Sequence, residues 1–148
     1  METVTLNIRK MTGNDIAYVR KLPVQLTGNA AIELIPRKFR WLMHDRNYRL
    51  LVCERDQKVA AFAGLNFSPS ADSGINFLVV NWFAADRFAL SLGLAAELEK
   101  QATELALENN SVALLVSSDK LTEKAKQFYL DRGYVLNGNT LIKKLDRN

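Results

Sequence analysis

One stretch of the sequence, residues 86–134, most constrains how this chain of 148 residues can fold. It contains a loop (86–92), a helix that begins after Gly93, an apolar segment (112–116) and a second helix that ends before Gly133. The apolar segment does not alternate with polar residues, so it predicts a strand that is covered on both faces. A helix, a strand and a helix in this order are typical of a sheet with helices on either side.

The rest of the chain supplies further strands and helices. Alternating or continuous apolar character predicts strands at residues 3–9, 48–54, 59–67, 75–84, 134–136 and 141–145. Helical spacing predicts a helix after a turn at residues 12–15, a second helical piece from about Ala30, and a new helix with Pro36 in its first turn. We therefore expect a single domain over residues 1–148, of class α/β (α+β in some schemes). Its mixed central sheet would have about six or seven strands, with helices on both faces.

Composition and charge exclude several classes of protein. The apolar fraction of 48% and the charged fraction of 24% are ordinary for a soluble globular domain. No apolar run approaches the roughly 20 residues that cross a bilayer, and the first residues lack the features of a signal peptide, so we expect no membrane association. The net charge of +4 is spread along the chain, so we expect no nucleic-acid-binding arm. Cys53 is the single cysteine, which favours a reducing cytoplasm, and His44 is the single histidine, which argues against a zinc site.

The last predicted helix carries the most specific motif. Residues 122–134 read Thr-Glu-Lys-Ala-Lys-Gln-Phe-Tyr-Leu-Asp-Arg-Gly-Tyr. This run resembles the pattern Asn-x-x-Ala-x-x-hydrophobic-Tyr-x-x-x-Gly-aromatic of the GNAT superfamily, the Gcn5-related N-acetyltransferases. The order of predicted elements resembles the same family over essentially the whole chain. The resemblance implies a GNAT-like fold that binds acetyl-coenzyme A (acetyl-CoA), and it gives Tyr129 the role of the acid that protonates the departing thiolate. Thr122 stands where the family usually has Asn. The alternative interpretation is that Phe128 and Tyr129 only pack this helix on the sheet.

The family's phosphate-binding pattern, Gln/Arg-x-x-Gly-x-Gly/Ala, aligns with residues 90–95. The alignment puts Leu90 at the Gln/Arg position, so backbone N–H groups rather than a polar side chain would bind the pyrophosphate. Arg87 would add positive charge from three positions earlier. The resemblance thus assigns the following residues to cofactor binding: Phe83, Ala84, Ala85, Arg87, Leu90, Ser91, Leu92, Gly93, Leu94, Ala95, Thr122, Phe128 and Tyr129.

In this family the acetyl group lies where two parallel strands part, which here are the ends of residues 75–85 and 112–117. The resemblance implies that a backbone hydrogen bond from around residues 83–85 polarises the thioester carbonyl. The first of these strands contains no carboxylate, and none of Asp72, Asp86 and Glu33 has a spacing that singles it out as a base. We therefore expect the attacking amine to lose its proton through ordered water.

The resulting hypothesis is an acetyl-CoA-dependent N-acetyltransferase that acetylates a primary amine of a small molecule or a protein by direct attack. The altered phosphate loop and the missing carboxylate favour an alternative, a catalytically weak or inactive member that binds acyl-CoA and serves a regulatory role. Members of the family often pair as homodimers, so the resemblance allows a homodimer without fixing it. The acceptor is left open, because the variable segment 16–47 sets it in this family.

Overall fold

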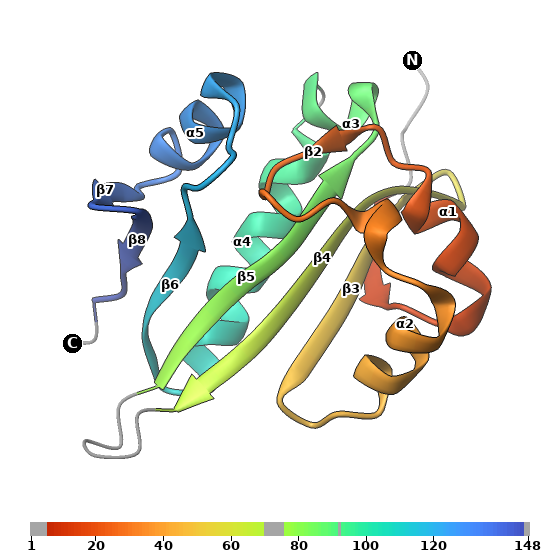
Figure 1. Cartoon of the computed structure of the whole chain (residues 1–148), viewed down its shortest axis with the longest axis horizontal. Helices are drawn as coiled ribbons and strands as arrows, with labels where there is room; N and C mark the ends of the chain where they lie inside the picture. Colours follow the sequence, from red (N-terminus) through yellow and green to blue (C-terminus); the bar gives the residue numbers. More distant parts are fainter. Residues whose placement is uncertain (1–5, 70–75, 92, 147–148) are drawn as a thin grey trace.

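The computed structural model describes residues 6–69, 76–91 and 93–146. Within them, the framework is an eight-stranded mixed sheet in the order β1-β3-β4-β5-β6-β8-β7, with β2 paired to β5 beside this path (Figure 1). The strands are β1 (Leu6–Lys10), β2 (Val24–Gln25), β3 (Tyr48–Arg55), β4 (Lys58–Pro69), β5 (Asn76–Ala85), β6 (Ser111–Ser117), β7 (Val135–Asn137) and β8 (Thr140–Lys144). The α-helices are α1 (Ile16–Arg20), α2 (Pro36–Met43), α3 (Arg87–Ser91), α4 (Leu94–Glu108) and α5 (Glu123–Leu130), with 3₁₀ turns η1 (Gly13–Asp15) and η2 (Ala31–Glu33).

The expected mixed sheet with helices on both faces is confirmed. Helix α4 lies across one face, and α1 and α2 lie on the other (Figure 1). Each face has its own buried core: Leu98 and Ala102 belong to the α4 side, and Val19 and Phe39 belong to the α1–α2 side. Pro36 occupies the first turn of α2, where its missing N–H costs no helical hydrogen bond.

The turn between β3 and β4 is tighter than the sequence predicts. The strands expected at 48–54 and 59–67 left residues 55–58 between them, but both strands extend into this segment and leave Asp56 and Gln57 as the two turn residues. Their φ angles are 50° and 69°. Two central residues with positive φ give a turn whose twist matches that of the flanking strands, which allows the longer pairing.

Two further elements depart from the expectations. Residues 86–92 were expected to be a loop, but residues 87–91 form the short helix α3, because the Asp86 carboxylate accepts the N–H of Ala89 and caps the helix. The short strand β2 was not predicted. Both elements lie at the end of β5 (Figure 1).

A buried polar cluster joins α4 to the C-terminal hairpin. The side chain of Glu99 on α4 is 4% exposed. Its carboxylate accepts hydrogen bonds from the Tyr134 hydroxyl at 2.8 Å and from Lys143 Nζ at 3.0 and 3.2 Å. The hydroxyl of Thr103 donates to the same carboxylate at 3.0 Å. Three donors therefore compensate one buried negative charge.

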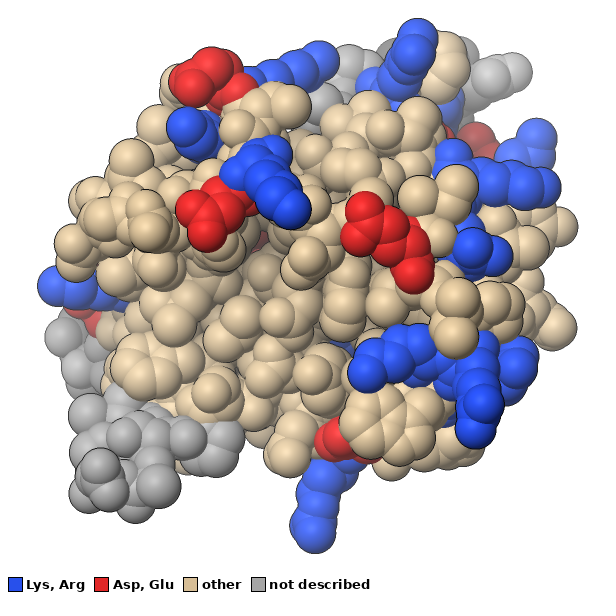
Figure 2. Space-filling model, in the orientation of Figure 1, with Lys and Arg blue, Asp and Glu red and all other residues tan. Residues whose placement is uncertain are grey.

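The charges on the surface have no strong bias on the face that is shown. Figure 2 shows both acidic and basic side chains on this face of the molecule, and the centre of the face is mostly uncharged. In the described part of the chain, every helix is too short or too polar to pass through a bilayer.

Candidate active site

The central strands β5 and β6 separate after a short common length, which leaves a fork in the sheet (Figure 1). Described residues of the two strands pair at four positions, which begin at Asn76↔Ser111 and end at Val79↔Leu115. Beyond these pairs β5 continues along β4, whereas β6 continues along β8. The fork is the parting of parallel strands that the family resemblance implied.

A bulge lies in β5 at the fork. The register between β4 and β5 shifts by one residue there, so Asn81 is an extra residue, and its amide donates to the side-chain oxygen of Asn66. Bulges of this kind re-aim a strand and are common beside functional sites. A cavity of about 300 Å³ opens at the same place, lined by Thr27, Gly28, Asn29, Val79, Val80, Asn81, Val116, Ser117, Asp119 and Lys120.

Tyr129 reaches the fork from α5. Its side chain is fully buried, and its ring packs edge-on against Phe128 at a centroid distance of 5.2 Å. Its hydroxyl donates a hydrogen bond to the backbone carbonyl of Leu26 at 2.5 Å. Burial raises the pKa of the Tyr129 phenol, and the negative charge of Glu99 raises it further. The phenol therefore keeps its proton at neutral pH and acts as a hydrogen-bond donor.

Thr122 has a defined structural role at the start of α5. Its backbone is extended, and its hydroxyl accepts the N–H of Ala125 at 3.1 Å. This is an N-cap, for which Asn and Thr are both suited. The departure from Asn at this position therefore preserves the helix start, which positions Tyr129 about two turns later.

The start of α4 has the backbone geometry of an anion site. Gly93 caps the helix with a left-handed backbone (φ 78°), and open space surrounds the position that a β-carbon would take. The side chains of Leu94 and Ala95 are buried in the core, so the first N–H groups of this 15-residue helix are held in place. Arg87 is exposed nearby in sequence.

The residues just before Gly93 differ from the expected loop. Leu90 and Ser91 belong to α3, and Leu92 lies outside the described residues. Since α3 uses Asp86 as its cap, part of the expected phosphate loop is already hydrogen-bonded within itself.

Residues 24–29, here called the strap, lie on the edge of β5 that β6 leaves free. The strand β2 within the strap pairs antiparallel with Ala84 and Ala85, and the N–H of Leu26 donates to the carbonyl of Phe83 at 2.7 Å. These are the backbone positions at which the family resemblance places the thioester. The strap was missed because a two-residue strand has too little periodicity to be recognised. The sequence feature that could have indicated the strap is the presence of apolar and β-branched residues directly after Pro23.

The carboxylates named from the sequence do not gather at the fork. Glu33 is exposed on η2, Asp86 binds the N–H of Ala89, and Asp72 lies outside the described residues. Asp119, which the sequence did not single out, lines the fork cavity. The Asp119 side chain is exposed to solvent. The expectation that ordered water takes the proton from the attacking amine stays a prediction.

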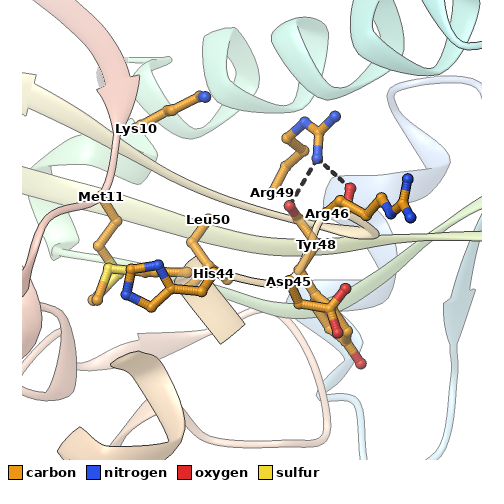
Figure 3. Close-up of a pocket in the computed structure, with 9 residues that line it drawn as sticks. Lys10, Met11, His44, Asp45, Arg46, Tyr48, Arg49 and Leu50 are labelled. Carbon is orange, nitrogen blue, oxygen red and sulfur yellow. Dashed lines mark hydrogen bonds between the residues drawn. The ribbon is translucent and has the colours of Figure 1, made fainter. Parts of the chain in front are cut away.

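A second cavity of about 300 Å³ lies away from the fork, between the ends of β1 and α2 and the start of β3. Figure 3 shows Arg49 donating to the backbone carbonyls of Arg46 and Tyr48, at 2.7 and 2.9 Å. Lys10 points away from the exposed His44 in the same view. The basic groups therefore do not converge on one point, and we assign no function to this cavity.

The fold and the fork can now be compared with known proteins. The family model of the acetyltransferase (GNAT) family matches residues 17–134 of this chain. The chain therefore belongs to the GNAT family of acetyltransferases, and the resemblance read from residues 122–134 is confirmed. No curated protein matches the sequence closely enough to show a relationship.

Solved structures with the same fold cover almost the whole chain. A transcriptional regulator from Bacillus halodurans superposes with a TM-score of 0.74 at 18% identity, covering 97% of this chain and 99% of that one. Ard1 from Thermoplasma volcanium gives 0.72 at 17% identity, with 96% and 99% covered. A mutant of the toxin AtaT, bound to the C-terminus of the antitoxin AtaR and acetyl-CoA, gives 0.66 at 21% identity, with 95% and 93% covered. At these identities the likeness establishes the fold.

Proposed function

We propose that this protein is an acetyl-CoA-dependent N-acetyltransferase that acetylates a primary amine of a small molecule or a protein. The observation that carries the proposal is the placement of the Tyr129 hydroxyl at the fork, where it bonds to Leu26, the residue whose N–H donates to Phe83 at the end of β5. Membership of an acetyltransferase family supports acyl transfer in general. The single, buried Cys53 is compatible with a reducing cytoplasm as the site of the reaction.

The residues at the start of α4 fit the anionic end of acetyl-CoA. Gly93 leaves its surroundings open, and the N–H groups of the first turn of α4 together with the helix dipole favour a pyrophosphate there. Arg87 adds positive charge. At the other end of the site, the backbone groups of residues 83–85 at the fork would bind the thioester.

When bound, acetyl-CoA supplies the acetyl group as a thioester, which a primary amine attacks directly. The chain itself contributes hydrogen-bond donors and a proton. Backbone N–H groups of the end of β5 stabilise negative charge on a carbonyl oxygen. Tyr129 holds a proton at its hydroxyl oxygen, and this proton serves a departing thiolate. Water in the fork cavity accepts the proton that the amine loses.

A thiol-release assay with acetyl-CoA and a panel of primary amines tests this proposal, together with calorimetry of acetyl-CoA binding. We expect Tyr129→Phe to lower turnover without weakening cofactor affinity, because the variant keeps the ring and removes the proton donor. Tyr18→Phe is the matched control, since Tyr18 is 63% exposed. A Tyr129→Phe variant that loses affinity as much as turnover would show that the residue only packs the helix.

Two observations favour a second candidate function, a catalytically weak member that binds acyl-CoA and regulates a partner. The proton donor Tyr129 is already bonded to Leu26, and position 90 lacks the family's Gln or Arg. The same two assays separate the candidates. Binding of acetyl-CoA without thiol release from any amine supports the regulatory module.

A further inference from the structure

The strap, residues 24–29, bridges the two arms of the fork. On one arm β4 already pairs with one edge of Ala84 and Ala85, so β2 must lie on their opposite edge, which faces β6. On the other arm, a β-carbon added to Gly28 would lie 2.5 Å from the carbonyl oxygen of Asp119, which follows β6. The strap backbone therefore touches both arms and closes the fork between them.

The two backbone groups of Leu26 hold the two parts of the proposed catalytic site. Its N–H donates to the carbonyl of Phe83 on β5, and its carbonyl accepts the hydroxyl of Tyr129 on α5. The Leu26 side chain is 1% exposed and belongs to the core of the α4 side. A single residue thus engages both the strand edge and the proton donor.

The strap also has its own supports. The hydroxyl of Thr27 donates to the carbonyl of Asn29 at 2.8 Å, and the amide of Asn29 donates to the carbonyl of the bulged residue Asn81 at 3.4 Å. Gln25 donates to the Leu22 carbonyl at 2.7 Å. These bonds, together with the pairing of β2 with β5, hold the closed strap in an ordered conformation.

A backbone edge of a strand pairs with one partner at a time. The strap and an extended, amide-containing ligand would compete for the same groups of residues 83–85. We propose that the strap is a gate: it closes the acyl-CoA site in the free protein, and it leaves the edge of β5 when acyl-CoA binds. Its departure also releases the Tyr129 hydroxyl, so binding and the freeing of the proton donor are one movement. This inference rests on the proposed binding of acetyl-CoA.

Amide hydrogen exchange of the wild-type protein, followed by NMR with and without coenzyme A, tests the gate directly. We expect the Leu26 amide to be protected in the free protein and to exchange faster at saturating coenzyme A, while amides that join β4 to β5 stay protected. A Leu26 amide that remains protected in the saturated complex overturns the gate and leaves the proposed function intact.

A pair of glycine variants gives an independent measurement. Gly28→Ala places a methyl group against the Asp119 carbonyl and disfavours the closed strap, whereas Gly13→Ala meets open space and is the control. The apparent affinity equals the intrinsic affinity multiplied by the fraction of molecules whose strap is open. We therefore expect Gly28→Ala, which raises that fraction, to bind coenzyme A on the order of tenfold more tightly. Equal affinities of the two variants in calorimetry overturn the gate. If neither the wild type nor Gly28→Ala binds coenzyme A, the proposed function itself fails, and the gate fails with it.

Discussion

The buried cluster around Glu99 gives a stability prediction that can be worked from its contacts. Lys143→Met removes the ammonium group and leaves a carboxylate that is almost completely withdrawn from water. Removing one partner of a buried ion pair costs about 3–5 kcal/mol. We expect about 3 kcal/mol, at the low end of that range, because Lys143 is partly exposed and the hydroxyls of Tyr134 and Thr103 still donate to Glu99. For a chain of this length that loss lowers the melting temperature by roughly 10 °C.

The reasoning is tested by a second variant that removes the stranded charge. In Glu99→Gln/Lys143→Met the neutral amide still accepts the Tyr134 hydroxyl, so about 2 kcal/mol of the loss should return. Urea unfolding followed by circular dichroism measures both free energies, and Lys100→Met, an exposed Lys on the same helix, is the control. A double variant no more stable than Lys143→Met would refute the claim that an uncompensated buried charge causes the loss.

Two further predictions concern buried groups elsewhere. Burial raises the pKa of the Cys53 thiol to about 11, so at about pH 8 a thiol reagent should label it only after unfolding, and rapid labelling of the native protein would contradict its placement in the core. Arg9 donates two hydrogen bonds to Asp15, at 2.7 and 2.9 Å, and thereby lowers the pKa of that carboxyl below 3.8. The contribution of the ionised Asp15 to stability is therefore complete above the ordinary carboxyl pKa and is lost as the pH falls through the lowered value. Asp15→Asn should accordingly make the free energy of unfolding fall less steeply as the pH is lowered into the acid range. An unchanged slope would refute this role.

The fold was largely predictable because its main elements have strong local signals. Pro36 marked the start of α2, and the unbroken apolar run 112–116 indicated the strand β6, although Val112 at its start is exposed rather than covered. The helix that carries Tyr129 was predicted from its motif. The strap was not, because the strand character of Val24 and Gln25 comes from pairing with a segment 60 residues later, which no local pattern records.

The candidate site was predictable only where local sequence patterns determine it. The sequence placed Tyr129 and the end of β5 together, and the structure brings both to the fork. It did not predict that the phenol would bond to Leu26, because that contact joins residues 103 positions apart. Nor did it predict α3, although Asp86 before a helix-compatible run is a capping signal that could have identified it.

The fork makes β5 an edge strand in the interior of a sheet. Beyond Val79 the edge of β5 opposite β4 has no neighbouring strand of the main path, and such unpaired edges readily recruit strands from other molecules. The strap shields this edge with a segment of the same chain. When the strap leaves β5 to admit a ligand, it also exposes the strand edge to other copies of the protein. Resistance to aggregation therefore depends on how briefly this edge stays uncovered.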